Sequence, residues 1–170
     1  SAGKVIGRMV SANLAIQSAE GELYADDMLS EYISEFSSAD FTAEVDNIPL
    51  EDQATLYGAT YSGDEFKATY TDAPPFGGLG GIQILSVRGV RKYRAWFFPK
   101  ARASMPDWDA TTRGDSISFG TQPIKMKIMT PLYGPWYYLK EFTTEADAKA
   151  YIDTKLGVAV WHDINVQVQG

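Results

Sequence analysis

The sequence predicts an α+β fold that is mainly β: an antiparallel β-sandwich or open barrel flanked by one amphipathic helix. Three observations lead to this prediction. Alternating apolar and polar residues recur along much of the chain. Helix signals occur in only two segments. A length of 170 residues, 45% of them hydrophobic, is enough for one domain with a core. The resulting order of strands, short helix, strands and second helix fits a helix packed on an antiparallel sheet.

The first half of the chain contains three strand-like segments. Residues 5–16 mix apolar and small side chains, with Gly7 at a bend or bulge, and a turn is expected at residues 20–21. Residues 39–45 alternate strictly between apolar and polar side chains, and residues 66–70 repeat that pattern. These segments predict strands with one face toward a core.

The second half contains four more. Residues 81–87 are apolar and β-branched, and residues 124–129 alternate between apolar side chains and lysines. Residues 90–98 are the clearest strand: the even-numbered side chains share one face and the odd-numbered ones the other. Residues 136–142 are aromatic and close the series.

Two segments, residues 49–57 and 144–156, carry helix signals. The first opens on a proline with acids in its first turn, and Thr144 with Asp147 resembles a capping box at the start of the second. Each is followed at once by a glycine, the usual residue after a helix end. The second helix has an apolar stripe made of Ala148, Tyr151, Ile152 and Leu156.

Two stretches are predicted to be long loops, at residues 71–81 and 101–115, and loops of such length are usually functional or disordered. The glycine run at residues 77–81 is no phosphate cradle, because it lacks the Gly-Lys-Ser/Thr ending and precedes a strand. It is either a flexible loop or one that orders against a neighbouring subunit. The chain is predicted to be one domain over 1–170, with an N-terminal arm at about 1–7 and a C-terminal strand segment at about 158–170.

The charge is divided between the two halves of the chain. Residues 1–75 carry 14 acidic and 3 basic side chains, a net −11, whereas residues 76–170 carry 8 acidic and 12 basic side chains, a net +4. A domain with one acidic and one basic half can attract copies of itself head to tail, which builds rings or filaments. Self-assembly is therefore the first functional hypothesis. The sequence pI of about 4.7 argues against nucleic-acid binding by the whole surface.

Catalytic signals are weak. The chain has no cysteine, which excludes disulfides, thiol catalysis and cysteine–zinc sites. The single histidine, His162, has no evident triad partner, and the adjacent acids at 26–27 and 51–52 point apart in a strand or helix. No calcium-loop spacing occurs. We expect neither an enzyme nor a cofactor or metal site. No apolar run is long enough to cross a bilayer, and the N-terminus lacks a signal-peptide core, so no membrane partner and an unsecreted product are expected.

Two binding functions remain open at this level. Arg88, Arg91, Lys92 and Arg94 are interleaved with aromatic residues, as in nucleic-acid patches. Because they fall on both faces of the strand, pairing with carboxylates is favoured. A monomeric carbohydrate-binding module is the other alternative, with four tryptophans as stacking platforms: Trp96, Trp108, Trp136 and Trp161.

Four sequence blocks carry a family resemblance. They are Leu23–Asp27, Ile48–Glu51 followed by Leu56–Gly58, Tyr93–Lys100, and Thr111–Ser116 running into Phe119–Thr121. Their order and spacing resemble the major tail proteins, or tail tube proteins, of bacteriophages with long non-contractile tails. The resemblance spans about residues 22–157.

The resemblance implies a β-sandwich flanked by a helix that assembles into hexameric rings, whose inner sheets join into one barrel around a lumen. Rings stack through the termini and a long loop, and viral DNA passes through without being bound. The implied partners are other copies of the chain and the tape-measure, tail-terminator and distal tail proteins. The implied location is the virion tail, assembled in the host cytoplasm. An inner tube of a contractile tail, bacteriocin particle or type VI-like secretion system is the alternative.

Three segments are the expected stacking elements: the loops Asp72–Gly81 and Arg102–Gly114 and the arm Ser1–Gly7. The expected inter-subunit contacts are Asp72, Pro74, Pro75, Phe76, Gly78, Arg102, Trp108 and Arg113. A negative lumen would repel DNA. The most acidic stretch supplies its expected wall: Asp26, Asp27, Asp40, Glu44 and Asp46.

Overall fold

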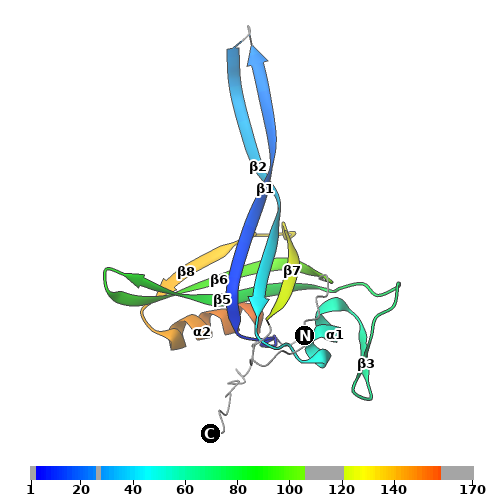
Figure 1. Cartoon of the computed structure of the whole chain (residues 1–170). Coiled ribbons are helices and arrows are strands. Elements are labelled where there is room, and N and C mark those ends of the chain that lie inside the picture. The colour runs from blue at the N-terminus through cyan, green and yellow to red at the C-terminus, as the bar shows by residue number, and fades with distance from the viewer. Residues whose placement is uncertain (1–2, 26–27, 106–120, 158–170) are drawn as a thin grey trace, which may run out of the picture.

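The computed structural model describes residues 3–25, 28–105 and 121–157 (Figure 1). Two helices and eight strands lie in this part of the chain. They are β1 (Met9–Ala25), β2 (Met28–Val45), α1 (Leu50–Tyr57), β3 (Thr60–Ser62), β4 (Glu65–Lys67), β5 (Phe76–Val87), β6 (Val90–Ser104), β7 (Gln122–Met129), β8 (Tyr138–Phe142) and α2 (Glu145–Leu156).

Six of these strands form one antiparallel sheet in the order β1-β2-β7-β6-β5, and β8 also pairs with β6. The sheet curls into a half-barrel, with α2 packed across β5 and β6 (Figure 1). Strands β3 and β4 form a separate small hairpin beside α1. The α+β class is confirmed, as is the open barrel flanked by an amphipathic helix.

Strand β6 contains a β-bulge that lets it change partner. Leu79 pairs with Phe98, but Gly77 pairs with Ala101, so β6 has one more residue than β5 across this step, at Pro99 and Lys100. Proline suits the site because it has no N–H to donate to a ladder. Along the opposite edge, β8 pairs with residues 93–97 and β7 with residues 101–104.

The core has two parts, one on each face of β6. Ala95 and Phe97 pack with Ala148 and Ile152 of α2. Phe98 belongs to the larger cluster inside the curl of the sheet. This opposition confirms the two faces predicted for residues 90–98. The other members of the larger cluster are Ala39, Phe41, Ala43, Val45, Ile48, Tyr57, Ala101, Ala103, Ile124, Met126 and Ile128.

Both predicted helices are confirmed. Helix α1 follows Pro49 and ends at Gly58, whose φ of 69° lies in the left-handed region. At the start of α2 the Thr144 hydroxyl accepts a hydrogen bond from the Asp147 N–H at 3.2 Å. The predicted apolar stripe faces the sheet, with Ala148 fully buried.

Strands β1 and β2 form a hairpin that is longer than the sheet to which it belongs. They pair from Met9–Val45 to Ala25–Met28, so the turn predicted at residues 20–21 is wrong. Strand β7 covers β2 only over Ser38–Val45. We call residues 18–25 and 28–37 the ribbon: among the described residues they have no third strand beside them, and Figure 1 shows them projecting from the body.

The predicted loop at residues 71–81 is correct only as far as Pro75, because β5 begins at Phe76. Its glycines are sites of close packing. A Cβ on Gly80 would lie 3.2 Å from Ile152 of α2, and a Cβ on Gly81 would lie 2.9 Å from Cε2 of Trp96. The run therefore leaves room for neighbours on both faces of the strand. Similarly, β6 extends to Ser104 into the second predicted loop.

Two other strand boundaries differ from prediction. The strand predicted over residues 66–70 is the short β4, which ends at Lys67. The first strand begins at Met9 and not at residue 5.

The glycine packing predicts a contrast within one strand. Gly81→Ala should lower the free energy of unfolding by about 1–3 kcal/mol, because the new methyl group overlaps the Trp96 ring. Gly77→Ala should change it by less than about 0.5 kcal/mol, because nothing lies within 4 Å of the new Cβ. Urea denaturation of dilute protein, followed by tryptophan fluorescence, measures both. Equal midpoints would contradict the close contact between β5 and Trp96.

Candidate functional site

The described strands leave the curled sheet with two open edges. Among the described strands β1 has only β2 as a neighbour, and β5 has only β6. An open edge carries a row of backbone N–H and C=O groups ready to pair with another strand. Between these two strands lies a hollow of about 300 Å³. It is lined by Met9, Val10, Ser11, Ala12, Asn13, Leu14, Phe41, Gln83, Trp96, Phe98 and Tyr137.

Two of the four tryptophans proposed as sugar platforms pack within the protein. Trp96 lies against Phe41 and Phe98, with ring centroids 5.1 and 5.4 Å apart. Trp136 stacks on Phe36 at the base of the ribbon, with centroids 3.7 Å apart. Both rings therefore support the core. Trp108 and Trp161 lie outside the described residues, as does His162.

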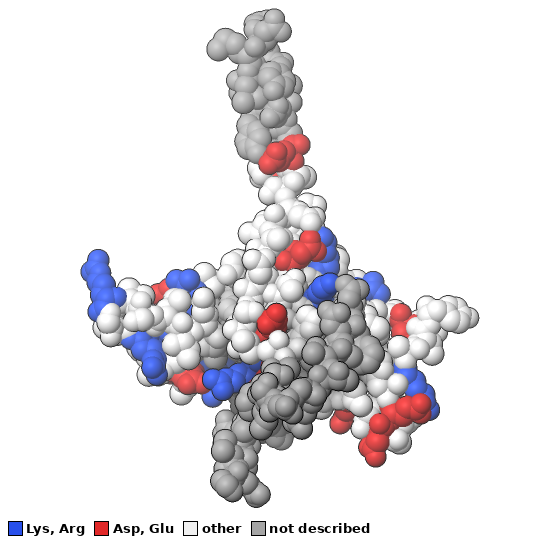
Figure 2. Space-filling model, in the orientation of Figure 1, with Lys and Arg blue, Asp and Glu red and all other residues white. Residues whose placement is uncertain are grey.

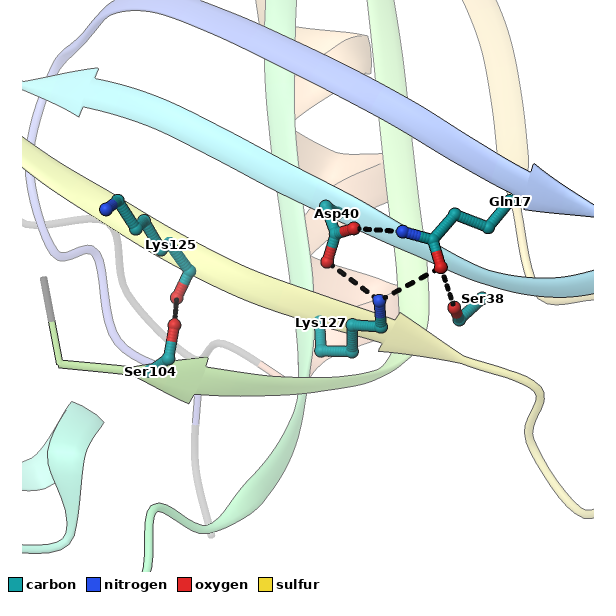
Figure 3. A network of polar contacts seen from close by, with 6 residues as sticks. All are labelled: Gln17, Ser38, Asp40, Ser104, Lys125 and Lys127. Atoms are coloured by element: carbon teal, nitrogen blue, oxygen red, sulfur yellow. Dashed lines mark hydrogen bonds and ion pairs between the residues drawn. The ribbon is translucent and has the colours of Figure 1, made fainter.

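The outer face of β1, β2 and β7 is polar, opposite the buried face of the half-barrel. Asp40 and Lys127 are cross-strand partners, and their charged atoms lie 2.9 Å apart (Figure 3). The Gln17 amide donates to the other Asp40 oxygen at 2.6 Å and accepts from Lys127 at 3.4 Å and from Ser38 at 3.3 Å. We call this arrangement of Gln17, Ser38, Asp40 and Lys127 the polar network.

The five acids proposed for a lumen do not act as one group. Asp40 and Glu44 share the polar face of β2, and Glu44 accepts a hydrogen bond from the Thr121 hydroxyl at 3.2 Å. Asp46 follows the strand and accepts from the Arg8 N–H at 2.7 Å. Asp26 and Asp27 lie outside the described residues. Because Lys127 balances Asp40, the described part of this face carries both signs of charge.

The structure brings together three of the proposed contact residues. Arg102 donates from Nε to the Pro74 carbonyl at 2.8 Å, and its guanidinium lies 5.0 Å from the centre of the Phe76 ring. The Lys100 ammonium lies 5.3 Å from the same ring, of which more than half is exposed. These residues make an aromatic and cationic patch at the start of β5, which we call the Phe76 patch.

Three of the other proposed contacts lie close to the Phe76 patch in sequence, and the remaining two fall outside the described residues. Asp72 accepts hydrogen bonds from the Thr69 N–H and hydroxyl, which lower the pKa of its carboxyl. Gly78 lies in β5 against Phe97, and Pro75 is exposed. Trp108 and Arg113 are outside the described residues.

The N-terminal arm is held on its own subunit from Lys4 onward. The Lys4 ammonium binds the Asp52 carboxylate, which is buried in α1, and lies 3.9 Å from Glu51. The hydrogen bond to Asp52 raises the pKa of Lys4. Backbone hydrogen bonding between Arg8 and Asp46 fixes the next part of the arm.

The basic residues of the β5–β6 turn and of the start of β6 divide into paired and unpaired groups. Arg94 donates to Glu141 of β8 at 2.6 Å, and this hydrogen bond lowers the pKa of Glu141. Lys92 lies 3.8 Å from the same carboxylate. Within the described part of the chain, the exposed side chains of Arg88 and Arg91 have no such partner.

The described residues contain no group of three or more possible metal ligands among His, Cys, Asp and Glu. No helix in the same part of the chain is long and apolar enough to cross a membrane. Comparisons with protein-family models, curated proteins and solved structures find no match to this chain. The open edges, the ribbon and the exposed charged groups are therefore what a functional proposal has to explain.

The arm contact predicts a specific loss of stability. Lys4→Met should lower the free energy of unfolding by about 1–3 kcal/mol, because it leaves the buried Asp52 carboxylate without its cation. The matched control is Lys67→Met, which breaks an ion pair with Glu65 whose side chains are both more than half exposed. It should cost at most about 1 kcal/mol. Equal losses in urea denaturation would contradict the arm contact.

Proposed function

We propose that this chain is a structural subunit of a bacteriophage tail tube. In this proposal copies of the chain form hexameric rings, the rings stack, and viral DNA passes through the lumen. The observation that carries the proposal is the ribbon, which projects beyond the sheet and has no third strand in the described part of the subunit. The ring number and the cargo come from the resemblance to tail tube proteins.

The ribbon supports assembly because a lone two-stranded hairpin is only marginally stable in water. Strands β1 and β2 have 17 and 18 residues, about three times the usual strand length. The ribbon gains support at its base from Phe36, which stacks on Trp136. Beyond that point a neighbouring subunit is the natural source of packing, and contact with the next ring is the role we assign to it.

The two open edges support ring formation. If β1 of one subunit lies beside β5 of the next, each half-barrel becomes part of a continuous wall and the edge hydrogen-bonding groups are satisfied. Pairing of this kind is heterologous, because two different edges meet, and it closes when the rotation between subunits allows. The sheet curvature would set that rotation.

The polar face of β1, β2 and β7 is our candidate for the lumen wall. It carries hydroxyl and amide groups together with the Asp40–Lys127 pair. A lysine already held by a carboxylate is less able to bind a phosphate, so DNA can move past it. The low affinity of the lumen for DNA then comes from internally paired charge as well as from repulsion by acids.

The expected partners follow from a tail location: tape-measure, tail-terminator and distal tail proteins, in a virion assembled in the host cytoplasm. A contractile tail, bacteriocin or secretion-system inner tube has a similar architecture. Tubes isolated from producing cells distinguish them. A sheath protein on the tube exterior would favour the contractile alternative, and bare tubes joined to a filled capsid would favour the proposed one.

Removing the ribbon tests the proposal. Gly21–Ile33 can be replaced by an Asn-Gly turn, because Glu20 and Ser34 are directly paired and a two-residue turn can join them. We expect a folded subunit that no longer forms tubes. Negative-stain electron microscopy and light scattering across a concentration series measure assembly, and circular dichroism measures folding.

The matched control places the same Asn-Gly turn at Gly63 and Asp64, between β3 and β4, where both residues already have positive φ. It should assemble like the wild type. Normal tubes from the ribbon deletion would contradict the assembly role of the ribbon. A wild-type chain that stays monomeric at every concentration would count against the whole proposal.

A further inference from the structure

Two hairpins of opposite charge project from the body. Between Ser18 and Ser37 the sequence has six acidic residues and no lysine or arginine. Between Leu85 and Arg94, at the turn joining β5 and β6, it has four basic residues and no acid. Figure 2 shows basic side chains at the end of that second hairpin. We call residues 85–94 the basic hairpin.

The end of the basic hairpin carries positive charge that no acid in the described part of the subunit neutralises. Lys92 and Arg94 already share Glu141. Arg88 and Arg91, closer to the turn, are exposed, and within the described residues their side chains have neither an ion pair nor a hydrogen bond. An acidic surface approaching this end would therefore meet two unpaired guanidinium groups.

The turn itself is built around an unusual residue. Val87 pairs with Val90, and the two residues between them, Arg88 and Gly89, have φ values of 53° and 80°. Turns of this kind favour Asn, Asp or Gly at the first position, and an arginine there is strained. Because nothing within the described subunit uses the Arg88 side chain, the strain is best explained by a contact outside it.

Apolar surface surrounds these charges on both hairpins. Val87 is 42% exposed and Val90 is 58% exposed at the basic turn. Ile16, two residues before the ribbon, is 55% exposed. A contact made here would bury these apolar side chains and pair the charged groups beside them.

The two hairpins cannot satisfy one another within one subunit, because they leave the body in different directions (Figure 1). Glu35 is the cross-strand partner of Ala19, and Glu20 that of Ser34, so the two acids lie on opposite faces of the ribbon. We propose that the edge of the ribbon of one copy docks on the basic hairpin of a second copy, so that Glu20 and Glu35 meet Arg88 and Arg91 from the two faces of the ribbon. The occupant of each surface is thus this same chain. Since two different patches meet, the contact is heterologous and can be repeated from copy to copy.

This inference rests on the self-assembly in the proposed function and adds the two surfaces that meet. The ion pairs would be solvent-exposed, so they should act mainly on the rate and register of association and weaken with salt. Assembly should therefore be slower at 0.5 M than at 0.05 M sodium chloride, two ionic strengths at which the Debye length differs by about threefold.

A charge exchange tests the pairing. Glu20→Lys with Glu35→Lys, or Arg88→Glu with Arg91→Glu, places like charges opposite one another at the contact, which costs more than the loss of an exposed ion pair. Either change should raise the concentration at half-assembly by about tenfold or more, the equivalent of about 1.4 kcal/mol. The four changes combined should return it to within about threefold of the wild type. Light scattering and electron microscopy follow assembly. A combined variant no better than the worse of its parents would overturn the pairing.

Two matched variants separate this effect from net charge and from folding. Glu65→Lys with Glu145→Lys makes the same change in net charge as Glu20→Lys with Glu35→Lys, but at exposed sites outside both hairpins. It should assemble like the wild type. Arg88→Asn removes one cation while placing a residue favoured at the turn. It should keep or improve the stability of the subunit yet weaken assembly, by about threefold. Unchanged assembly would count against the contact.

The absence of cysteine allows a direct test of which surfaces meet. Two single-cysteine variants, Glu35→Cys and Arg88→Cys, are mixed, assembled and treated with a short thiol–thiol crosslinker. The mixture should give a covalent dimer, and neither variant alone should, because the contact joins unlike patches. Glu65→Cys with Arg88→Cys is the control pair and should remain uncrosslinked.

The outcomes separate this inference from the proposed function. Tubes that form normally without the mixed crosslink, and without dependence on the four charges, would overturn the docking of ribbon on basic hairpin while leaving a tube-forming subunit. Tubes that never form from the wild-type chain would overturn both.

Discussion

The fold depends on the one-residue bulge at Pro99 and Lys100 of β6. Before the bulge, Phe97 faces α2 and Phe98 faces the interior of the half-barrel; after it, Ala101 and Ala103 face that same interior. If the residues of β6 alternated strictly, with no bulge, Arg102 would share the core-facing side of Phe98 and the two alanines would lie on the opposite face. Burying an unpaired arginine is prohibitively costly, so the register is strongly fixed. The same step ends pairing with β8 and begins pairing with β7, which allows the sheet to curl.

The incomplete parts of the subunit follow from this arrangement. Strand β6 has neighbouring strands on both edges and core residues on both faces, so the core is concentrated around it. The outermost strands make the fewest packing contacts with this core. Among the described strands, β1 and β5 are left with open edges, and the ribbon extends past the last residue that β7 covers. The described part of a lone subunit therefore exposes long stretches of unpaired backbone, which proteins usually cover or blunt. Further copies of the chain can cover this backbone, and the curvature that the bulge creates lets successive copies close into a ring.

The sequence predicted the locally determined features and missed those set by distant contacts. Alternation located most strands, and Thr144, Asp147 and the following glycine defined α2, because these signals act within a few residues. The glycines of β5 are typical of a loop when only local sequence is considered. They lie in a strand because Trp96 and Ile152, remote in sequence, pack where side chains would otherwise be. Of the proposed site, the link from Pro74 and Phe76 to Arg102 depends on strand register, which no local pattern reveals. Residues 18–37 contain six acids and no lysine or arginine, and this is the sequence signal that indicates an exposed ribbon.

The charged hairpins and the open strand edges have different roles in assembly. Edge pairing and apolar burial are short-ranged and strong, so they can hold a tube together but cannot guide subunits toward it. Charges at the ends of projecting hairpins act over several ångströms and reach a neighbour first, so they set orientation and rate more than final affinity. Like-charged ribbons also repel one another, which disfavours a symmetric ribbon-to-ribbon dimer that would stop growth. At long range, the contact between unlike hairpins is therefore the attractive one. The stability of the finished tube comes from edge pairing and apolar burial, which salt does not screen.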